Sequence, residues 1–189
     1  MPLTTTLSLA CHPQTPSAAV GGVEVRVRRS APDALALTFA VEGDLARIRV
    51  PSPRAPRFAH QLWEHTCFEV FLAAEGTTIY HELNLAPSGE WAGYRFRDYR
   101  EVEALVDDAL APSIATVTIG DRLVVNTLVE VRHLSPDYPS VRLRLGFSAV
   151  IEETDGRHSY WALHHPSGQP DFHHRDTRAL LLEPVQREW

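Results

Sequence analysis

Hydrophobic and polar residues alternate with a period of two along much of the chain. The segment 23–28 (VEVRVR) alternates valine with charged residues. A repeat of two places successive side chains on opposite faces of an extended strand, which leaves one face apolar and the other polar. The same pattern predicts further strands with apolar positions at Leu35, Leu37, Phe39 and Val41, at Leu123, Val125, Thr127, Val129 and Val131, and at Val141, Leu143, Leu145, Phe147, Ala149 and Ile151.

Turn-forming dipeptides separate the predicted strands. Gly120-Asp121 and Asp155-Gly156 lie between apolar runs and predict tight hairpins, because Gly and Asp tolerate positive φ angles. Gly43-Asp44 predicts a further hairpin into a strand with its apolar positions at Ile48 and Val50. The prolines at positions 51, 53 and 56 predict a rigid loop after that strand.

One stretch has a helical pattern. Asp98 and Glu101 have the spacing of a capping box, which is typical of a helix N-terminus. We therefore expect one short helix that ends before Pro112. Its apolar face would consist of Val102, Leu105, Val106 and Ala109.

These elements predict an all-β fold with at most one short helix. Short antiparallel strands with turns at this spacing favour a two-sheet antiparallel β-sandwich of the jelly-roll or immunoglobulin-like kind. A closed β-barrel is the competing architecture. At 189 residues, the whole chain (1–189) is expected to form a single domain.

Composition and charge exclude several classes of function. The net charge of -6 disfavours nucleic-acid binding, which needs a basic surface. All 18 basic residues are arginines, so no lysine is present to form a Schiff base. The chain has no apolar run of membrane-spanning length and no secretory signal, and Cys11 and Cys67 lack the spacing of a disulfide framework. We expect a cytoplasmic protein with two free thiols and no membrane association.

Residues 67–72 (CFEVFL) break the alternation, because both of their faces are apolar except at Glu69. Two apolar faces are typical of a central strand that is covered on both sides. A carboxylate in such a strand must be paired, hydrogen-bonded or open to a wet cavity, since burying an unpaired charge costs several kcal/mol. We therefore expect Glu69 to mark a site, held there by a neighbouring guanidinium and amide.

Polar residues on the next two segments are the expected partners of this carboxylate. They are interpreted in two ways. The first is an arginine–carboxylate network that only pins the strand register. The second is a concave pocket that hydrogen-bonds a polyol while Trp63 or Trp91 packs on a sugar ring. The expected partners are Tyr80, Glu82, Asn84, Arg95 and Arg97.

Several of these segments resemble the bacterial DOMON-like proteins. The stretches that carry the resemblance are 62–72 (LWEHTCFEVFL), 80–94 (YHELNLAPSGEWAGY), 159–166 (SYWALHHP) and 170–174 (PDFHH). This group is similar to the β-sandwiches of DOMON domains and of family 9 carbohydrate-binding modules. The resemblance therefore implies a β-sandwich over residues 60–175.

The resemblance also implies a non-catalytic domain that binds haem or sugar, the two ligand classes of the wider superfamily. The haem-binding branch pairs methionine with histidine as axial ligands, whereas the only methionine of this chain is Met1. A bis-histidine site would have to use positions such as His81 or His165.

The sugar-binding branch clamps its ligand between tryptophans. The resemblance offers Trp63, Trp91 and Trp161 for this role, and of these we expect Trp91 and Trp161 to provide the stacking surface. A tryptophan in a sandwich also packs in the core, and we expect Trp63 and Phe68 to do so.

The histidine-rich C-terminal part offers a different kind of ligand. Neighbouring residues of a strand point to opposite faces, so at most one of His164 and His165 faces any given site. Two interpretations stay open. These histidines hydrogen-bond turns and loops, or one member of each pair joins a carboxylate in a site for a divalent transition metal. The candidate metal ligands are His165, Asp171 and His173.

Together these patterns predict a domain that binds a small polar ligand, a saccharide in particular, without transforming it and without a cofactor. One alternative is a haem- or metal-binding module that uses histidines. A second is a glycosidase built on Glu69 and Glu82, and a third is a protein-interaction module that includes a homodimer paired through edge strands. The residues expected to contact the ligand are Glu69, Tyr80, Glu82, Asn84, Trp91, Arg95 and Trp161.

Overall fold

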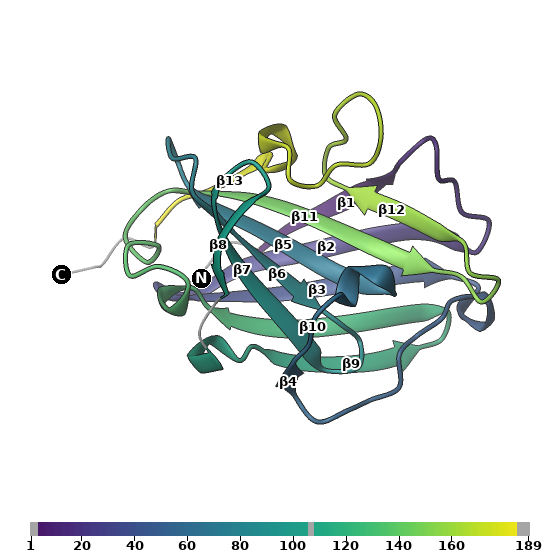
Figure 1. Ribbon diagram of the computed structural model, residues 1–189. Coiled ribbons are helices and arrows are strands. Elements are labelled where there is room, and N and C mark those ends of the chain that lie inside the picture. Colours follow the sequence, from purple (N-terminus) through teal and green to yellow (C-terminus); the bar gives the residue numbers. More distant parts are fainter. Residues whose placement is uncertain (1–3, 106–107, 185–189) are drawn as a thin grey trace.

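The structure, a computed structural model, describes residues 4–105 and 108–184. Within these residues the chain forms 13 strands and short 3₁₀ segments (Figure 1). The strands are β1 (Thr4–Cys11), β2 (Val20–Ala31), β3 (Ala34–Gly43), β4 (Arg57–Phe58), β5 (Cys67–Ala74), β6 (Tyr80–Leu85), β7 (Glu90–Asp98), β8 (Glu101–Leu105), β9 (Ser113–Ile119), β10 (Arg122–Glu130), β11 (Leu143–Glu152), β12 (His158–Ala162) and β13 (Leu180–Leu182). The 3₁₀ segments are η1 (Leu45–Arg47), η2 (Leu62–Glu64), η3 (Asp108–Leu110), η4 (Val131–His133) and η5 (Arg175–Thr177).

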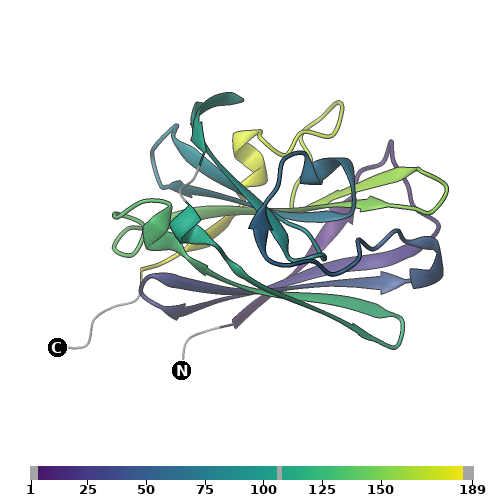
Figure 2. The ribbon, with the colours of Figure 1, turned by 60° about the horizontal axis from the view of Figure 1, so that its bottom comes forward.

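The strands form one hydrogen-bonded sheet that folds over itself. Its order is β4-β7-β6-β5-β11-β12-β1-β2-β3-β10-β9, with β13 beside β11 and β8 beside β7. The pairings are antiparallel except for that of β4 with β7, which is parallel. Figures 1 and 2 show the result as two facing layers, one containing β5, β6, β7, β11 and β12 and the other β2, β3, β9 and β10.

Strand β1 joins the two layers. Its residues 4–9 pair with β2, whereas Ala10 and Cys11 pair with β12. The prediction of an all-β fold is confirmed, but that of two separate sheets is not, because one continuous ladder crosses from layer to layer. The ends of this ladder are β4 and β9. Homodimer formation through such an edge stays a prediction.

The core lies between the layers and is built from the alternating apolar positions. Leu37, Phe39 and Val125 of one layer face Phe68 and Phe147 of the other, and all five side chains are buried. The Phe39 and Phe68 rings stack with their centroids 4.9 Å apart. The period of two therefore places the inward face of each of these strands correctly.

In place of the helix expected between Asp98 and Pro112, the described residues form β8 and the short 3₁₀ segment η3. Residues 98–101 instead form the two-residue turn between β7 and β8, in which Asp98 pairs with Glu101. Arg100 takes a left-handed φ of 54°, and the Asp98 carboxylate accepts a hydrogen bond from the backbone N–H of Tyr99. A capping box and a two-residue hairpin both place polar residues three positions apart, so the spacing alone does not separate them. Val106, part of the expected apolar face, lies outside the described residues.

The predicted turns meet different outcomes. The Gly120-Asp121 hairpin is confirmed, since Ile119 pairs with Arg122 across it, and Asp155-Gly156 lies in the turn between β11 and β12. The hairpin after Gly43 is wrong. Asp44 caps η1, and Ile48 makes one isolated bridge to Glu153 before the proline-containing loop. No helical segment in the described part of the chain has the length and apolarity to cross a membrane.

Candidate functional site

The outward face of β5, β6 and β7 carries the candidate site. Every residue of β6 is buried, although its alternate side chains point away from the core between the layers. The cover comes from η2 and from the loop that follows β12, whose Phe172 packs on the outward face beside Phe71 and Tyr94. A second, smaller apolar cluster therefore lies on the outside of this layer.

Two carboxyl groups lie within that cluster. Glu69 accepts a hydrogen bond from the Ser148 hydroxyl at 3.0 Å, and Glu82 accepts one from the Asn84 amide at 2.7 Å. Glu69 stands opposite Ser148 in the register of β5 and β11, whereas Glu82 and Asn84 are two residues apart on the same face of β6. The second oxygen of the Glu69 carboxyl group has no hydrogen bond within the described residues.

Burial changes the protonation of both carboxyl groups. It raises the pKa of Glu69 above its usual range, and the nearby charge of Glu82 raises it further. Burial also raises the pKa of Glu82, against the opposing effects of Asn84 and Arg100. Two carboxylates in a low-dielectric site do not ionise together readily, so a proton is held in this pair at neutral pH. A protonated carboxyl group donates one hydrogen bond and still accepts others.

His173 connects the carboxyl groups to Tyr80. Its Nδ1 lies 2.9 Å from the Tyr80 hydroxyl, and its Nε2 lies 3.6 Å from a carboxyl oxygen of Glu82. Burial and the Arg100 guanidinium lower the pKa of His173 to about 4, so the ring is neutral at physiological pH. Because the imidazole ring is neutral, its contact with Glu82 is a polar contact and not an ion pair.

Glu69, Glu82 and His173 line a cavity of about 630 Å³ on this outward face. We call it the outer cavity. Trp63 stands at its edge with 41% of its surface exposed. The Tyr94 hydroxyl is buried beside it and has no hydrogen-bond partner among the described residues. Flat apolar walls around a few polar groups are typical of small-ligand sites. Its lining includes Trp63, Glu69, Glu82, Tyr94, Tyr160, Phe172 and His173.

The structure brings four of the predicted ligand contacts together. Glu69 and Glu82 line the outer cavity directly. Asn84 lies behind them and orients Glu82, while Tyr80 lies next to His173. Their role toward a ligand stays a prediction.

The two predicted stacking tryptophans do not reach this cavity. Trp91 is 2% exposed, Trp161 is 6% exposed, and both belong to the core between the layers. Trp91 pairs with Leu85 and Trp161 with Ala149, which are inward positions of their strands. The roles expected for the tryptophans are therefore reversed. Trp91 and Trp161, expected at the ligand, lie in the core, whereas Trp63, expected in the core, lines the cavity. The prediction that Phe68 is in the core is confirmed.

Arg95 also lies on the other face of the layer. It pairs with His81 in the register of β6 and β7 and forms an ion pair with Glu103. Its charge contributes, after burial, to lowering the pKa of His81 to about 4. The guanidinium expected beside Glu69 is therefore not Arg95. Glu69 can be buried because the Ser148 hydroxyl donates a hydrogen bond to it, and because its raised pKa favours the uncharged, protonated carboxyl group.

The predicted metal ligands are engaged elsewhere. His165 contacts the Ala10 carbonyl oxygen at 2.8 Å, and Asp171 pairs with the Arg100 guanidinium at 3.0 Å. Across residues 4–105 and 108–184, no three His, Cys, Asp or Glu side chains are grouped to hold a metal ion. His81, a candidate haem ligand, is buried and contacts the Tyr138 hydroxyl at 2.7 Å. Met1 lies outside the described residues.

The sequence interpretation missed the aromatic lining of the outer cavity. A usable signal was present for Tyr94. The turn at 86–89 pairs Leu85 with Trp91, which places Tyr94 opposite Glu82 on the outward face. No comparable signal identifies Tyr160 or Phe172, since their position depends on how the later strands and loops pack.

Comparisons with known proteins agree with this fold. The chain is similar to a crystal structure from Bacteroides uniformis ATCC 8492 of a protein to which carbohydrate binding is attributed. The TM-score is 0.66 at 14% identity, over 90% of this chain and 81% of the other. It is also similar to a family 9 carbohydrate-binding module from Caldicellulosiruptor kristjanssonii in complex with glucose. That match has a TM-score of 0.53 at 12% identity, over 92% and 80% of the two chains.

No protein-family model matches the sequence, and no curated protein matches it. At identities this low, the structural likeness shows a shared fold. The chain therefore has the fold of a carbohydrate-binding module.

Proposed function

We propose that the protein binds a saccharide in the outer cavity and releases it unchanged. The observation that carries this proposal is the placement of the Glu69 and Glu82 carboxyl groups at a cavity with Trp63 at its edge. Its volume of about 630 Å³ lies within the usual range for small-molecule sites.

The chemistry of the lining fits a polyol. Carboxyl groups, protonated or not, hydrogen-bond the hydroxyl groups of a sugar. The Tyr94 hydroxyl, which no described residue hydrogen-bonds, offers a further contact. The rings of Trp63 and Tyr160 present flat apolar surface to the C–H faces of a pyranose. A mixed surface of this kind favours a neutral sugar over a purely apolar ligand.

The fold supports the same proposal. Both similar structures are described as carbohydrate-binding, and one contains glucose. We infer on the same basis, together with the resemblance of residues 62–72 and 80–94, that this chain is a DOMON-like relative of the family 9 modules. Non-catalytic binding is part of this inference.

The proposal is tested by tryptophan fluorescence and calorimetry with glucose and cello-oligosaccharides. Trp91 and Trp161 are buried in the core, Trp189 lies outside the described residues, and Trp63 lines the cavity, so we expect a sugar-dependent emission change to come from Trp63. Trp63→Phe should abolish the emission change and retain most of the affinity measured by calorimetry. Trp63→Ala should weaken binding about tenfold or more, since stacking on an aromatic ring is lost.

A matched pair of variants separates the site from general electrostatics. Glu69→Leu removes a cavity carboxyl group, whereas Glu42→Gln changes an exposed residue of the opposite layer. We expect only the first to weaken sugar binding. Absence of any sugar binding by the wild-type protein would refute the proposal, and release of product from aryl glycosides would replace it with the glycosidase.

A further inference from the structure

Two arginines in the described part of the chain are buried, Arg29 and Arg178, which are 4% and 8% exposed. Neither lies within 4.0 Å of a described carboxylate. A buried guanidinium needs acceptors for its five N–H groups, because leaving a buried charge unpaired is costly. The two side chains meet this need to different degrees.

Arg29 is satisfied by the backbone. Its Nε, Nη1 and Nη2 atoms donate hydrogen bonds to the carbonyl oxygens of Pro32, Glu183 and Tyr138, at 3.1, 3.0 and 2.6 Å. Each nitrogen therefore has an acceptor within the protein. This arginine serves as a structural link between segments far apart in sequence.

Arg178 has one such acceptor. Its Nη1 donates to the His173 carbonyl oxygen at 3.3 Å, and its guanidinium carbon lies 4.6 Å from the centre of the Tyr80 ring. The other two nitrogens have no hydrogen bond within the described residues. Burial lowers the pKa of Arg178, which reflects a charge that the protein compensates incompletely.

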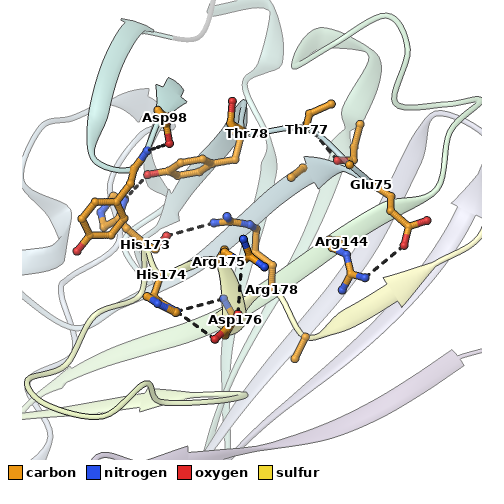
Figure 3. A pocket seen from close by; sticks show the side chains of 16 residues that line it. Glu75, Thr77, Thr78, Asp98, Arg144, His173, His174, Arg175, Asp176 and Arg178 are labelled. Carbon is orange, nitrogen blue, oxygen red and sulfur yellow. Dashed lines mark hydrogen bonds and ion pairs between the residues drawn. The ribbon is translucent and has the colours of Figure 1, made fainter.

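Arg178 lies at a second cavity, of about 860 Å³, which we call the end cavity (Figure 3). Three acidic residues line it, Glu75, Asp98 and Asp176, and the Asp98 carboxylate accepts a hydrogen bond from the Tyr99 backbone N–H at 2.7 Å. Glu75 pairs with Arg144 at 3.2 Å, and Asp176 contacts His174 at 3.6 Å and Arg175 at 3.7 Å. Figure 3 shows these pairs around the cavity, with Arg178 directed toward His173. None of these carboxylates lies within 4.0 Å of the Arg178 guanidinium, and Asp176 supports its charge only from a longer distance.

The backbone holds Arg178 at this place. Gly146 of β11 lies under η5, and a Cβ atom there would come within 3.0 Å of the Thr177 carbonyl oxygen. The Thr177 hydroxyl also donates to the carbonyl oxygens of Phe172 and His174, at 2.8 and 2.7 Å. The close approach of η5 to β11 and these hydrogen bonds pre-organise the turn that carries Arg178.

We propose that the end cavity binds an oxyanion, a carboxylate or a phosphate group, on Arg178. A planar guanidinium with free N–H groups matches the two oxygens of such a group, and a bound anion supplies the close counter-charge that the described residues do not provide. His173 lines both cavities. The oxyanion is therefore either a free anion or an acidic substituent of a saccharide held in the outer cavity. The site does not depend on the sugar proposal.

Calorimetric titration of the wild-type protein with phosphate, acetate and methyl glucuronide tests this proposal, at constant ionic strength set with chloride. We expect saturable binding of phosphate or of a carboxylate. Phosphate binding alone identifies a phosphate ligand. Methyl glucuronide binding about tenfold tighter than acetate identifies an acidic saccharide. A protein that binds none of the three probes overturns the proposal without recourse to any variant.

Variants locate the anion. Arg178→Gln should weaken anion binding about tenfold or more. Arg178→Lys should retain part of the binding, because a lysine keeps the positive charge but loses the planar pair of N–H donors. Arg26→Gln is the matched control, since Arg26 is exposed on the opposite layer. Equal anion affinity in folded Arg178→Gln and wild-type protein would also overturn the proposal. Glucose binding, read at Trp63, reports separately on the outer cavity.

Discussion

The outward faces of the two layers differ, although the same alternation builds both inward faces. On β2, β3 and β10 the outward positions are partly or fully exposed and include Arg26, Thr38 and Asn126. On β5 and β6 the outward positions, such as Phe71 and Glu82, are buried under loops. Loss of alternation therefore marks the layer that carries a second cluster and its cavities.

A buried polar residue has a different role on each of the two faces of a strand. His81 points inward, contacts Tyr138 and supports packing between the layers. Glu82, the next residue, points outward and lines the outer cavity, where burial raises the pKa of its carboxyl group. Of two neighbouring residues on one strand, His81 therefore stabilises the packing between the layers, and Glu82 belongs to the proposed binding site. Substitutions can test this difference.

The largest effect is expected from two tryptophans that differ in face. Trp91→Ala should lower the free energy of unfolding by about 3–5 kcal/mol, since it empties a core position. Trp63→Ala should lower it by less than about 1 kcal/mol while it impairs sugar binding. Denaturant titration of both variants measures the difference. Similar losses of stability would mean that Trp63 is a core residue after all.

The second effect is a pH dependence that arises from the outward face. The folded protein holds protons on Glu69 and Glu82 that the unfolded chain releases near the ordinary pKa of 4.5. The free energy of unfolding should therefore fall as pH rises above 4.5 through neutrality, by about 1.4 kcal/mol per pH unit for each proton involved.

The difference between wild-type and Glu69→Gln protein isolates this slope, because glutamine does not titrate. His81 and His173, with pKa values lowered to about 4, act in the opposite direction below pH 6.5 but are common to both proteins. Urea denaturation at a series of pH values gives the two slopes. An unchanged slope in Glu69→Gln would contradict burial of this carboxyl group.

A third contrast uses two glycines. Gly146→Ala should cost about 1–3 kcal/mol, because the new Cβ atom meets the backbone of Thr177. Gly22→Ala, on the exposed layer, meets nothing within 4 Å and should be neutral or stabilising by up to about 1 kcal/mol. Thermal unfolding of both variants provides the measurement. A neutral Gly146→Ala would show that η5 does not pack closely on β11.

The smallest contrast concerns two hydroxyl groups. Ser148→Ala removes the hydrogen bond to buried Glu69 and should cost about 1 kcal/mol. Thr38→Val removes a solvent-exposed hydrogen bond to Asn126 and should change stability by less than about 0.5 kcal/mol. Chemical denaturation resolves this difference. Equal costs would indicate that the two outward faces are solvated alike.

The inward faces of the strands could be predicted because a period of two is a local property. Val25, Phe39 and Val125 needed only their own segments for a correct assignment. Burial of Glu69 followed from the same reasoning, since a run without polar positions has no wet side. These predictions depend on neighbours in sequence, not on the packing of distant elements.

The candidate site was predicted only in part, because its composition depends on register. Grouping Trp91 and Arg95 with Glu82 required a pairing one residue away from the observed one, and a shift of one residue exchanges the two faces. The helix over 98–109 failed for a related reason. Asp98 and Glu101 could either cap a helix or close a hairpin, and pairing with β7 selected the hairpin.

The sequence by itself determined an all-β fold, the inward face of most strands and one acidic residue in a dry strand, since these follow from local alternation and the cost of burying charge. Only the tertiary structure decided that β1 links the two layers, that Trp63 and not Trp91 stands at the cavity, and that Arg178 is buried with no carboxylate of the described residues within 4.0 Å. The physical reason is that these features arise where separate segments of the chain pack together, and no pattern within one segment encodes that contact.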